Sequence, residues 1–111
     1  MAEKPNARVL DFSKRAVPYM DVVMPDGARL TVLEPTKDLY EAMVAFEDGD
    51  EALPEKVGEL FALAAEILSN NREGTPVPEA DVERDLPVSA CRALLARYWK
   101  FVGEEVLAAK N

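Results

Sequence analysis

The sequence has 111 residues, of which 49% are hydrophobic and 31% are charged. This length suits one domain with a modest core of its own, and the composition argues against a disordered chain. With 21 acidic residues against 13 basic ones, the net charge is −8, so the chain lacks the positive surface that drives non-specific binding to nucleic acids.

The chain is expected to consist of a short N-terminal tail and a single domain. Residues 1–7 are polar and contain Pro5, which predicts a flexible tail, and residues 8–109 are expected to form one domain. No stretch resembles a signal peptide or approaches the about 18 apolar residues of a membrane span. The lone cysteine, Cys91, excludes an intrachain disulfide and fits a reducing compartment, so we expect a cytoplasmic protein.

A β-hairpin is predicted within residues 8–33. Two runs with many β-branched residues, 19–24 and 29–33, flank Pro25-Asp26-Gly27, and these three residue types suit a tight turn. Alternation places apolar side chains on one face and polar ones on the other. The expected inner face is Met20, Val22, Leu30 and Val32, and the expected outer face is Asp21, Arg29 and Thr31. Residues 8–12 are a candidate third strand.

Residues 36–109 are expected to form about four helices, so the predicted fold class is α+β, predominantly helical. Thr36 can cap the first helix, and apolar residues recur at helical spacing up to Phe46. Pro54 is expected at the first position of the second helix, which carries a wide apolar stripe closed by Asn70, Asn71 and Gly74. A short helix over 79–86 and a long one over 88–109 follow.

The last predicted helix contains "RYWKFV" at residues 97–102. On a helical wheel its apolar arc spans about 160°, which is wide enough to contact two neighbours. Tyr98 and Val102 lie at the centre of the arc, and we predict that both belong to the core. Leu94 and Phe101 lie on one shoulder and Leu107 lies outside the arc, so these three are the predicted partner-binding residues. Trp99 shares the other shoulder with Val106 and is expected to be packed.

The sequence offers no pattern typical of catalysis, cofactor binding or metal binding. Histidine is absent, the single cysteine therefore has no imidazole partner, and the five glycines are scattered. The acidic loop 47–51 lacks the ligand spacing of an EF-hand, and the acids at 79, 81, 83 and 85 do not share one helix face. We therefore expect a non-enzymatic protein without cofactors.

Three stretches carry a family resemblance over about residues 9–107. They are "VLDFSKRAVPYMDVVMPDGARLTVLEPTKDLYE" at 9–41, "AAEILSNNREGTPVPEADVERDLP" at 64–87, and the closing "RYWKFV". The chain resembles the tail assembly chaperones of long-tailed bacteriophages and prophages of Gram-positive hosts. The matching positions are structural landmarks, such as Pro18-Tyr19 and Glu34-Pro35-Thr36-Lys37, and none of them is a catalytic motif.

The resemblance implies a hairpin followed by helices and a role in tail morphogenesis. Such chaperones bind the tape-measure protein, keep its hydrophobic helices soluble and help recruit tail-tube subunits. It also implies the host cytoplasm as location, absence from the mature virion, and in many cases a longer form made by ribosomal frameshifting. Self-association of the chain is compatible with this family, whereas binding to nucleic acid or membrane is not expected.

Two other classes of function stay open at this point. An acidic inhibitor or DNA mimic of phage origin would suit the charge, but Lys and Arg interrupt the acidic residues, as in Glu83-Arg84-Asp85. A small helical regulator of transcription would need a basic recognition helix, which the sequence does not indicate.

Overall fold

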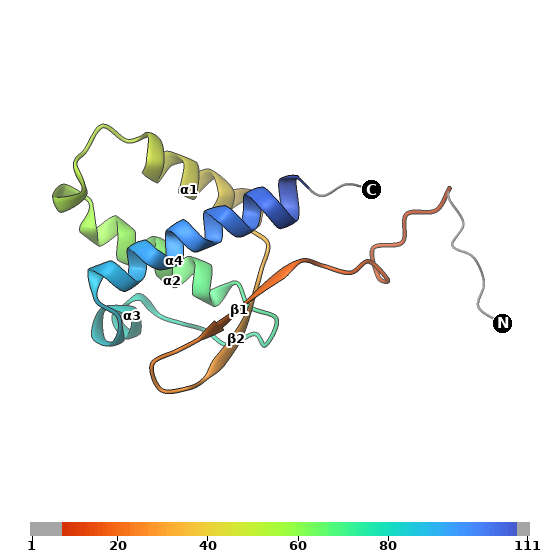
Figure 1. The fold of residues 1–111 in the computed structure, drawn as a ribbon, viewed down its shortest axis with the longest axis horizontal. Helices are drawn as coiled ribbons and strands as arrows, with labels where there is room; N and C mark the ends of the chain where they lie inside the picture. Colours follow the sequence, from red (N-terminus) through yellow and green to blue (C-terminus); the bar gives the residue numbers. More distant parts are fainter. Residues whose placement is uncertain (1–7, 109–111) are drawn as a thin grey trace.

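The computed structural model describes residues 8–108, so the predicted tail over residues 1–7 and the last helix position, Ala109, lie outside the described residues. A two-stranded sheet precedes a group of helices, which confirms the predicted α+β class (Figure 1). The elements in chain order are β1 (Tyr19–Val23), β2 (Arg29–Leu33), α1 (Lys37–Asp48), a 3₁₀ helix (Leu53–Glu55), α2 (Val57–Ser69), α3 (Glu79–Asp85), α4 (Val88–Phe101) and a π-helix (Val102–Leu107).

The hairpin has the predicted turn and the predicted faces. Gly27 adopts a φ of 90°, which only glycine reaches without strain, and the Asp26 side chain accepts a hydrogen bond from the backbone N–H of Ala28 at 2.9 Å. The strands are antiparallel, with Met20 opposite Val32 and Val22 opposite Leu30. These four side chains share one face of the hairpin. Leu30 and Val32 on β2 are buried in the core, whereas Met20 and Val22 on β1 are half-buried.

Two of the predicted helix starts have different outcomes. The hydroxyl of Thr36 accepts a hydrogen bond from the backbone N–H of Leu39 at 3.2 Å, which confirms the predicted cap of α1. The prediction that Pro54 opens the second helix is wrong. Pro54 lies in the separate 3₁₀ turn, Lys56 has non-helical dihedral angles (φ −118°, ψ 23°), and α2 begins at Val57.

The last helix changes its hydrogen-bonding pattern instead of continuing as one α-helix. After Phe101 the chain forms a π-helix over Val102–Leu107, in which the backbone N–H of Ala108 donates to the carbonyl of Gly103 at 3.2 Å. Gly103 is the weakest helix former in this stretch, and its low propensity makes the change of pattern less costly there. The predicted last helix is therefore present up to Leu107, but it changes from α to π geometry after residue 101.

Residues 8–12 do not form the third strand considered above. Residues 8–18, here called the N-terminal arm, instead leave the body of the protein (Figure 1). A local turn occupies part of the arm, because the backbone N–H of Lys14 donates to the carbonyl of Asp11 at 3.2 Å, and the Asp11 side chain binds Ser13. The radius of gyration is 16.3 Å, against about 13 Å for a compact chain of this size.

The core is organised around α2, which contacts α1, α3, α4 and β2. Figure 1 shows α1 and α4 lying along it, with α3 and the hairpin at one end. The most completely buried side chains are Val32, Met43, Leu60, Ile67, Leu68, Val82, Cys91, Tyr98 and Val102. Tyr98 and Val102 are thus in the core as predicted.

The chain directly after α2 covers the outer edge of β2. Val32 and Asn71 form an isolated antiparallel bridge, the backbone N–H of Leu33 donates to the carbonyl of Asn70 at 2.9 Å, and that of Arg72 donates to the carbonyl of Thr31 at 2.8 Å. Asn70 and Asn71 had been assigned only to the end of the helix. In the structure they also act as a short substitute for a third strand.

Candidate functional site

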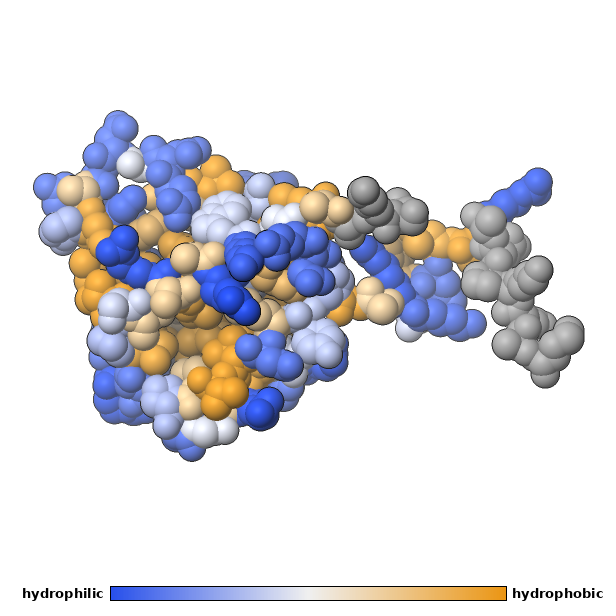
Figure 2. Space-filling model, in the orientation of Figure 1, coloured by the Kyte–Doolittle hydropathy of each residue, from blue (hydrophilic) through white to orange (hydrophobic). Residues whose placement is uncertain are grey.

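The strongest candidate for a binding site is a groove of about 580 Å³ between β1 and α4. We call it the β1–α4 groove. Its lining comprises Met20, Asp21, Val22, Val23, Met24 and Pro25 from the hairpin, Leu68 from α2, Leu86 from the end of α3, and Ala90, Ala93, Leu94 and Arg97 from α4. Figure 2 shows the corresponding face of the molecule as hydrophobic and hollowed between α4 and the hairpin.

The width of the groove follows from the residue types that face each other across it. On the hairpin side the inward-pointing Met20 and Val22 are only half-buried, because α4 does not close over them. On the helix side Ala90 and Ala93 have small side chains, which leave space that a larger residue would fill. Unbranched methionine side chains adapt to ligands of different shapes. This lining is therefore suited to apolar segments whose side chains differ in size and shape.

The groove carries one charge of each sign, which can orient a ligand. Asp21 lies on the strand and Arg97 lies on α4, and both side chains are exposed at the margin of the groove. All other lining residues are apolar. Apolar walls with a few polar groups at the margin are typical of binding sites.

The three predicted partner-binding residues have three different environments. Leu94 lines the β1–α4 groove and is half-buried. Leu107 is 65% exposed on the π-helix and does not line this groove. Phe101 is only 6% exposed.

Phe101 therefore lies in the core and not on the accessible shoulder on which the helical wheel placed it. Its ring stacks on that of Tyr98, with 5.8 Å between the ring centroids and 27° between the planes. On the other shoulder, the rings of Trp99 and of Tyr40 from α1 form a T-shaped pair, with 5.8 Å between their centroids. The aromatic residue on each shoulder is packed in this way, so one core uses all three aromatic residues of "RYWKFV".

The arm is a second feature that the sequence reasoning did not single out. Val9, Leu10 and Phe12 are 61%, 72% and 70% exposed, although side chains of these types are usually buried. The arm leads directly into β1, the strand that lines the groove. The exposed apolar arm and the apolar groove are thus adjacent in sequence, and the alternation of Leu10 and Phe12 could have indicated the arm.

β1 also has an unpaired edge. It pairs with β2 on one side, and within residues 8–108 no other strand or bridge joins it. An open strand edge presents backbone N–H and C=O groups that can pair with another extended segment. Apolar side chains and backbone pairing groups are therefore available together at the groove.

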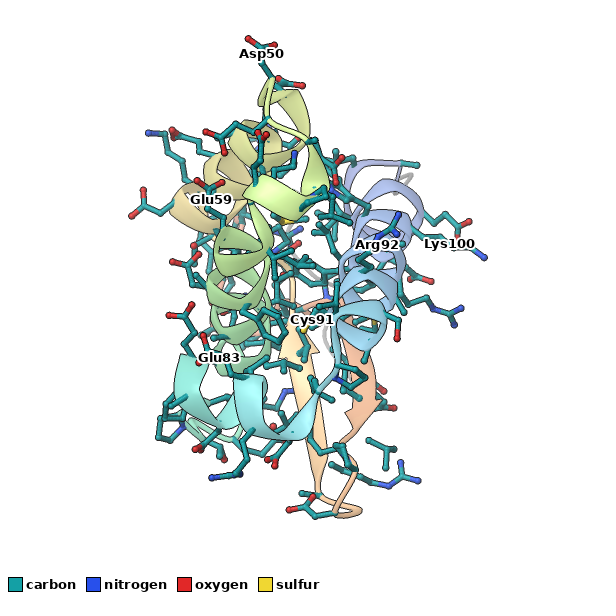
Figure 3. All side chains as sticks on the ribbon, turned by 90° about the vertical axis from the view of Figure 1, so that its left-hand side faces the viewer. Asp50, Glu59, Glu83, Cys91, Arg92 and Lys100 are labelled. Carbon is teal, nitrogen blue, oxygen red and sulfur yellow. The ribbon has the colours of Figure 1, made fainter. Side chains whose placement is uncertain are left out.

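Carboxylates gather at one hollow of the helical body. Figure 3 shows Glu59 and Glu83 on the side of α2 and α3, Asp50 at the top, and Arg92 and Lys100 on the side of α4. A hollow of about 660 Å³ between α1 and α2 is bordered by the carboxylates of Asp50, Glu51, Glu59 and Glu66. The one basic residue there, Lys56, donates to the carbonyl of Phe46 at 2.6 Å and lies 4.2 Å from the centre of its ring.

The buried titratable groups of the core are held in their neutral forms. Burial raises the pKa of the Cys91 thiol, and burial likewise raises the pKa of Tyr98, whose hydroxyl donates to the carbonyl of Leu33 at 2.6 Å. In the part of the chain that the structure describes, no cluster of three or more His, Cys, Asp or Glu side chains could hold a metal ion. What this arrangement offers chemically is contact with an apolar segment in the groove.

No helix within residues 8–108 combines the length and the apolar character that crossing a membrane requires. Comparison of the chain with protein-family models, with curated proteins and with solved structures gives no match.

Proposed function

We propose that this protein is a tail assembly chaperone that binds an apolar helical segment of a tape-measure protein in the β1–α4 groove. The family resemblance of the sequence supplies the identity of the client. The observation that carries the proposal is the groove itself, because its lining is apolar apart from Asp21 and Arg97. A groove of this kind can take the apolar face of an amphipathic helix.

The adaptability of the lining supports this role. A tape-measure protein presents many similar apolar stretches, so its chaperone must accept side chains of several shapes. Met20 and Met24 stand at two points along the strand side of the groove, and methionine is common on surfaces that bind varied helices. Leu94 contributes the main aliphatic contact from α4.

The charge of the chain supports the solubilising part of the role. A complex with an aggregating client stays soluble when its remaining surface carries strong net charge. The chain has a net charge of −8, and the carboxylates of Asp50, Glu51, Glu59 and Glu66 border the hollow between α1 and α2, away from the groove. On this proposal the protein acts without catalysis in the host cytoplasm, helps recruit tail-tube subunits, and is absent from the finished virion.

An acidic inhibitor or DNA mimic remains the second candidate. The observation in its favour is the hollow between α1 and α2, where the carboxylates of Asp50, Glu51, Glu59 and Glu66 lie together. Such a protein would bind a basic partner through these carboxylates, and the β1–α4 groove would play no part. Substitutions in the two hollows therefore separate the two functions.

The test is co-expression with a tape-measure protein encoded by the same phage or prophage. We expect the client to become soluble and to co-purify with the wild-type chain. Leu94→Glu places a charge in the groove and should lower the co-purified client at least about tenfold, as expected for a central contact of an interface. Leu107→Glu is the matched control, because this leucine is exposed outside the groove.

Thermal unfolding of both variants shows whether the body stays folded. An insoluble client in the presence of the wild-type chain would contradict the proposal. So would equal recovery of the client with Leu94→Glu and with the wild-type chain. Loss of partner binding on Glu59→Gln and Glu66→Gln, but not on Leu94→Glu, would favour the acidic inhibitor.

A further inference from the structure

We propose that the N-terminal arm of one copy of the chain occupies the β1–α4 groove of a second copy, and that the exchange is reciprocal. The product is a two-fold symmetric dimer in which each groove is filled by the partner's arm. The proposal concerns the groove already described, but it requires no client.

The arm has side chains that fit such a site. Leu10 and Phe12 are exposed and separated by one residue, so an extended arm would place both on the same face. That face can enter the groove beside Met20 and Val22. The intervening Asp11 would point to solvent, as Asp21 does on β1.

The groove offers backbone partners as well as apolar contacts. The outer edge of β1 is unpaired in the described chain, and an extended peptide can add to such an edge as a further strand. From Leu10 to Tyr19 the chain can span at most about 30 Å when it is extended. Five residues of strand need about 17 Å of this length, which leaves about 13 Å for the connection to the other copy.

The charges of the arm and the body are complementary. The arm, residues 8–18, contains three basic residues and one acidic residue. Residues 19–108 contain eight basic and 19 acidic residues. A positively charged arm is therefore attracted to the body of another copy, and this attraction should weaken as salt is added.

The course of the chain favours a second copy over the arm's own groove. To pair with its own β1, the arm would have to reverse direction within residues 14–18. In the structure this segment is not a turn that returns to the body but runs away from it (Figure 1). Exchange between copies makes the same contacts without that reversal, which is why swapped elements are a common route to dimers.

The first experiment measures mass in solution by sedimentation over a range of protein concentrations at low and high salt. We expect a monomer–dimer equilibrium that shifts toward monomer at high salt. Phe12→Glu in the arm and Leu94→Glu in the groove should each raise the dissociation constant at least about tenfold. Leu107 is about as exposed as Phe12, and Leu107→Glu should leave the dissociation constant unchanged.

The second experiment distinguishes exchange from folding back. A chain carrying Ser13→Cys, which keeps Phe12, is mixed with a differently tagged chain carrying Ala93→Cys, and a short bismaleimide is added. Ala93 lines the groove and is exposed, whereas the native Cys91 is fully buried. We expect a cross-linked dimer that contains both tags.

Three outcomes would overturn the proposal: a monomer at all concentrations, a dimer broken by Leu107→Glu but not by Phe12→Glu, or cross-linking only within one chain when both cysteines are on it. These measurements use no client. A dimer that solubilises no tape-measure protein would therefore remove the proposed function alone, and a client-binding monomer would remove the arm exchange alone.

Discussion

The two outer edges of the β1–β2 sheet differ, because one is paired with further backbone and the other is open. The edge of β2 is covered by the chain that follows α2, through the bridge between Val32 and Asn71 and the flanking backbone hydrogen bonds. The edge of β1 has no such cover in the described chain and adjoins an apolar groove. An open strand edge can pair with another extended segment. The β2 edge therefore stabilises the fold, whereas the β1 edge is available for association.

The covered edge is also tied to the helices. The Tyr98 hydroxyl donates to the carbonyl of Leu33, and the amide of Asn70 donates to the same carbonyl at 3.2 Å and to that of Glu34 at 2.9 Å. The end of β2 is thereby joined to both α4 and the end of α2. Substitutions on this side should change stability, and substitutions on the open side should change association.

The largest expected effect is that of Tyr98→Ala, which removes a fully buried ring and its hydrogen bond to β2. The free energy of unfolding should fall by about 3–5 kcal/mol, as for other buried aromatic truncations. Chemical denaturation measures it. Tyr98→Phe keeps the ring and should cost only about 1–2 kcal/mol; if it cost as much as Tyr98→Ala, the hydrogen bond and not the packing would dominate.

The next effect is that of Asn71→Ala at the bridge. The buried amide of Asn71 donates to the carbonyls of Leu68 and Thr75, and its oxygen accepts from the backbone N–H of Thr75 at 2.9 Å. Leaving these groups unpaired should cost about 2–3 kcal/mol in unfolding free energy. Val23→Thr on the exposed face of β1 is the control, and its expected change is below about 0.5 kcal/mol. Equal losses would show that the two edges do not differ as described.

The smallest effect concerns acid stability. The Glu73 carboxylate accepts hydrogen bonds from the backbone N–H of Thr31 at 2.9 Å and from its hydroxyl at 2.7 Å, and these bonds hold the pKa of Glu73 below its ordinary value of 4.5. Because the folded state favours the ionised form, the stabilisation is present above pH 4.5 and is lost as the pH falls through the lowered pKa.

Glu73→Gln should therefore lower the melting temperature slightly at pH 7, and the difference from the wild-type chain should shrink as the pH decreases from about 5 toward 3. Melting curves at a series of pH values measure this. Glu104→Gln on the π-helix makes the same change of charge without contacting the hairpin, and it should show no such convergence. A constant difference at all pH values would contradict the role assigned to Glu73.

The parts of the fold that depend on local chemistry could be predicted from the sequence. Pro25-Asp26-Gly27 specifies a tight turn by itself, and Thr36 caps the helix that follows it, so the hairpin and α1 were predicted. The central positions of α4 were predicted too, because helical periodicity alone places Tyr98 and Val102 on one face.

The parts that depend on distant contacts could not be predicted. Asn71 joins β2 across 39 residues of sequence, and nothing near either residue indicates that pairing. Phe101 was assigned to the surface because a wheel shows only the arc of its own helix and not what covers the two shoulders. The candidate site was predicted in part, since Leu94 does line the groove. Met20 and Val22, which line its strand side, were predicted only as the inner face of the hairpin.

The exposed arm also has a consequence for protein turnover. Lys14 and Arg15 are adjacent, exposed and outside any helix or strand, and such segments are preferred sites of proteolytic cleavage. A cut after Arg15 would release Leu10 and Phe12, whereas every residue of the buried core lies beyond it. The body should therefore survive trypsin after this first cut. In an exchanged dimer both sites would be shielded, so the rate of trimming reports the fraction of arms that are docked.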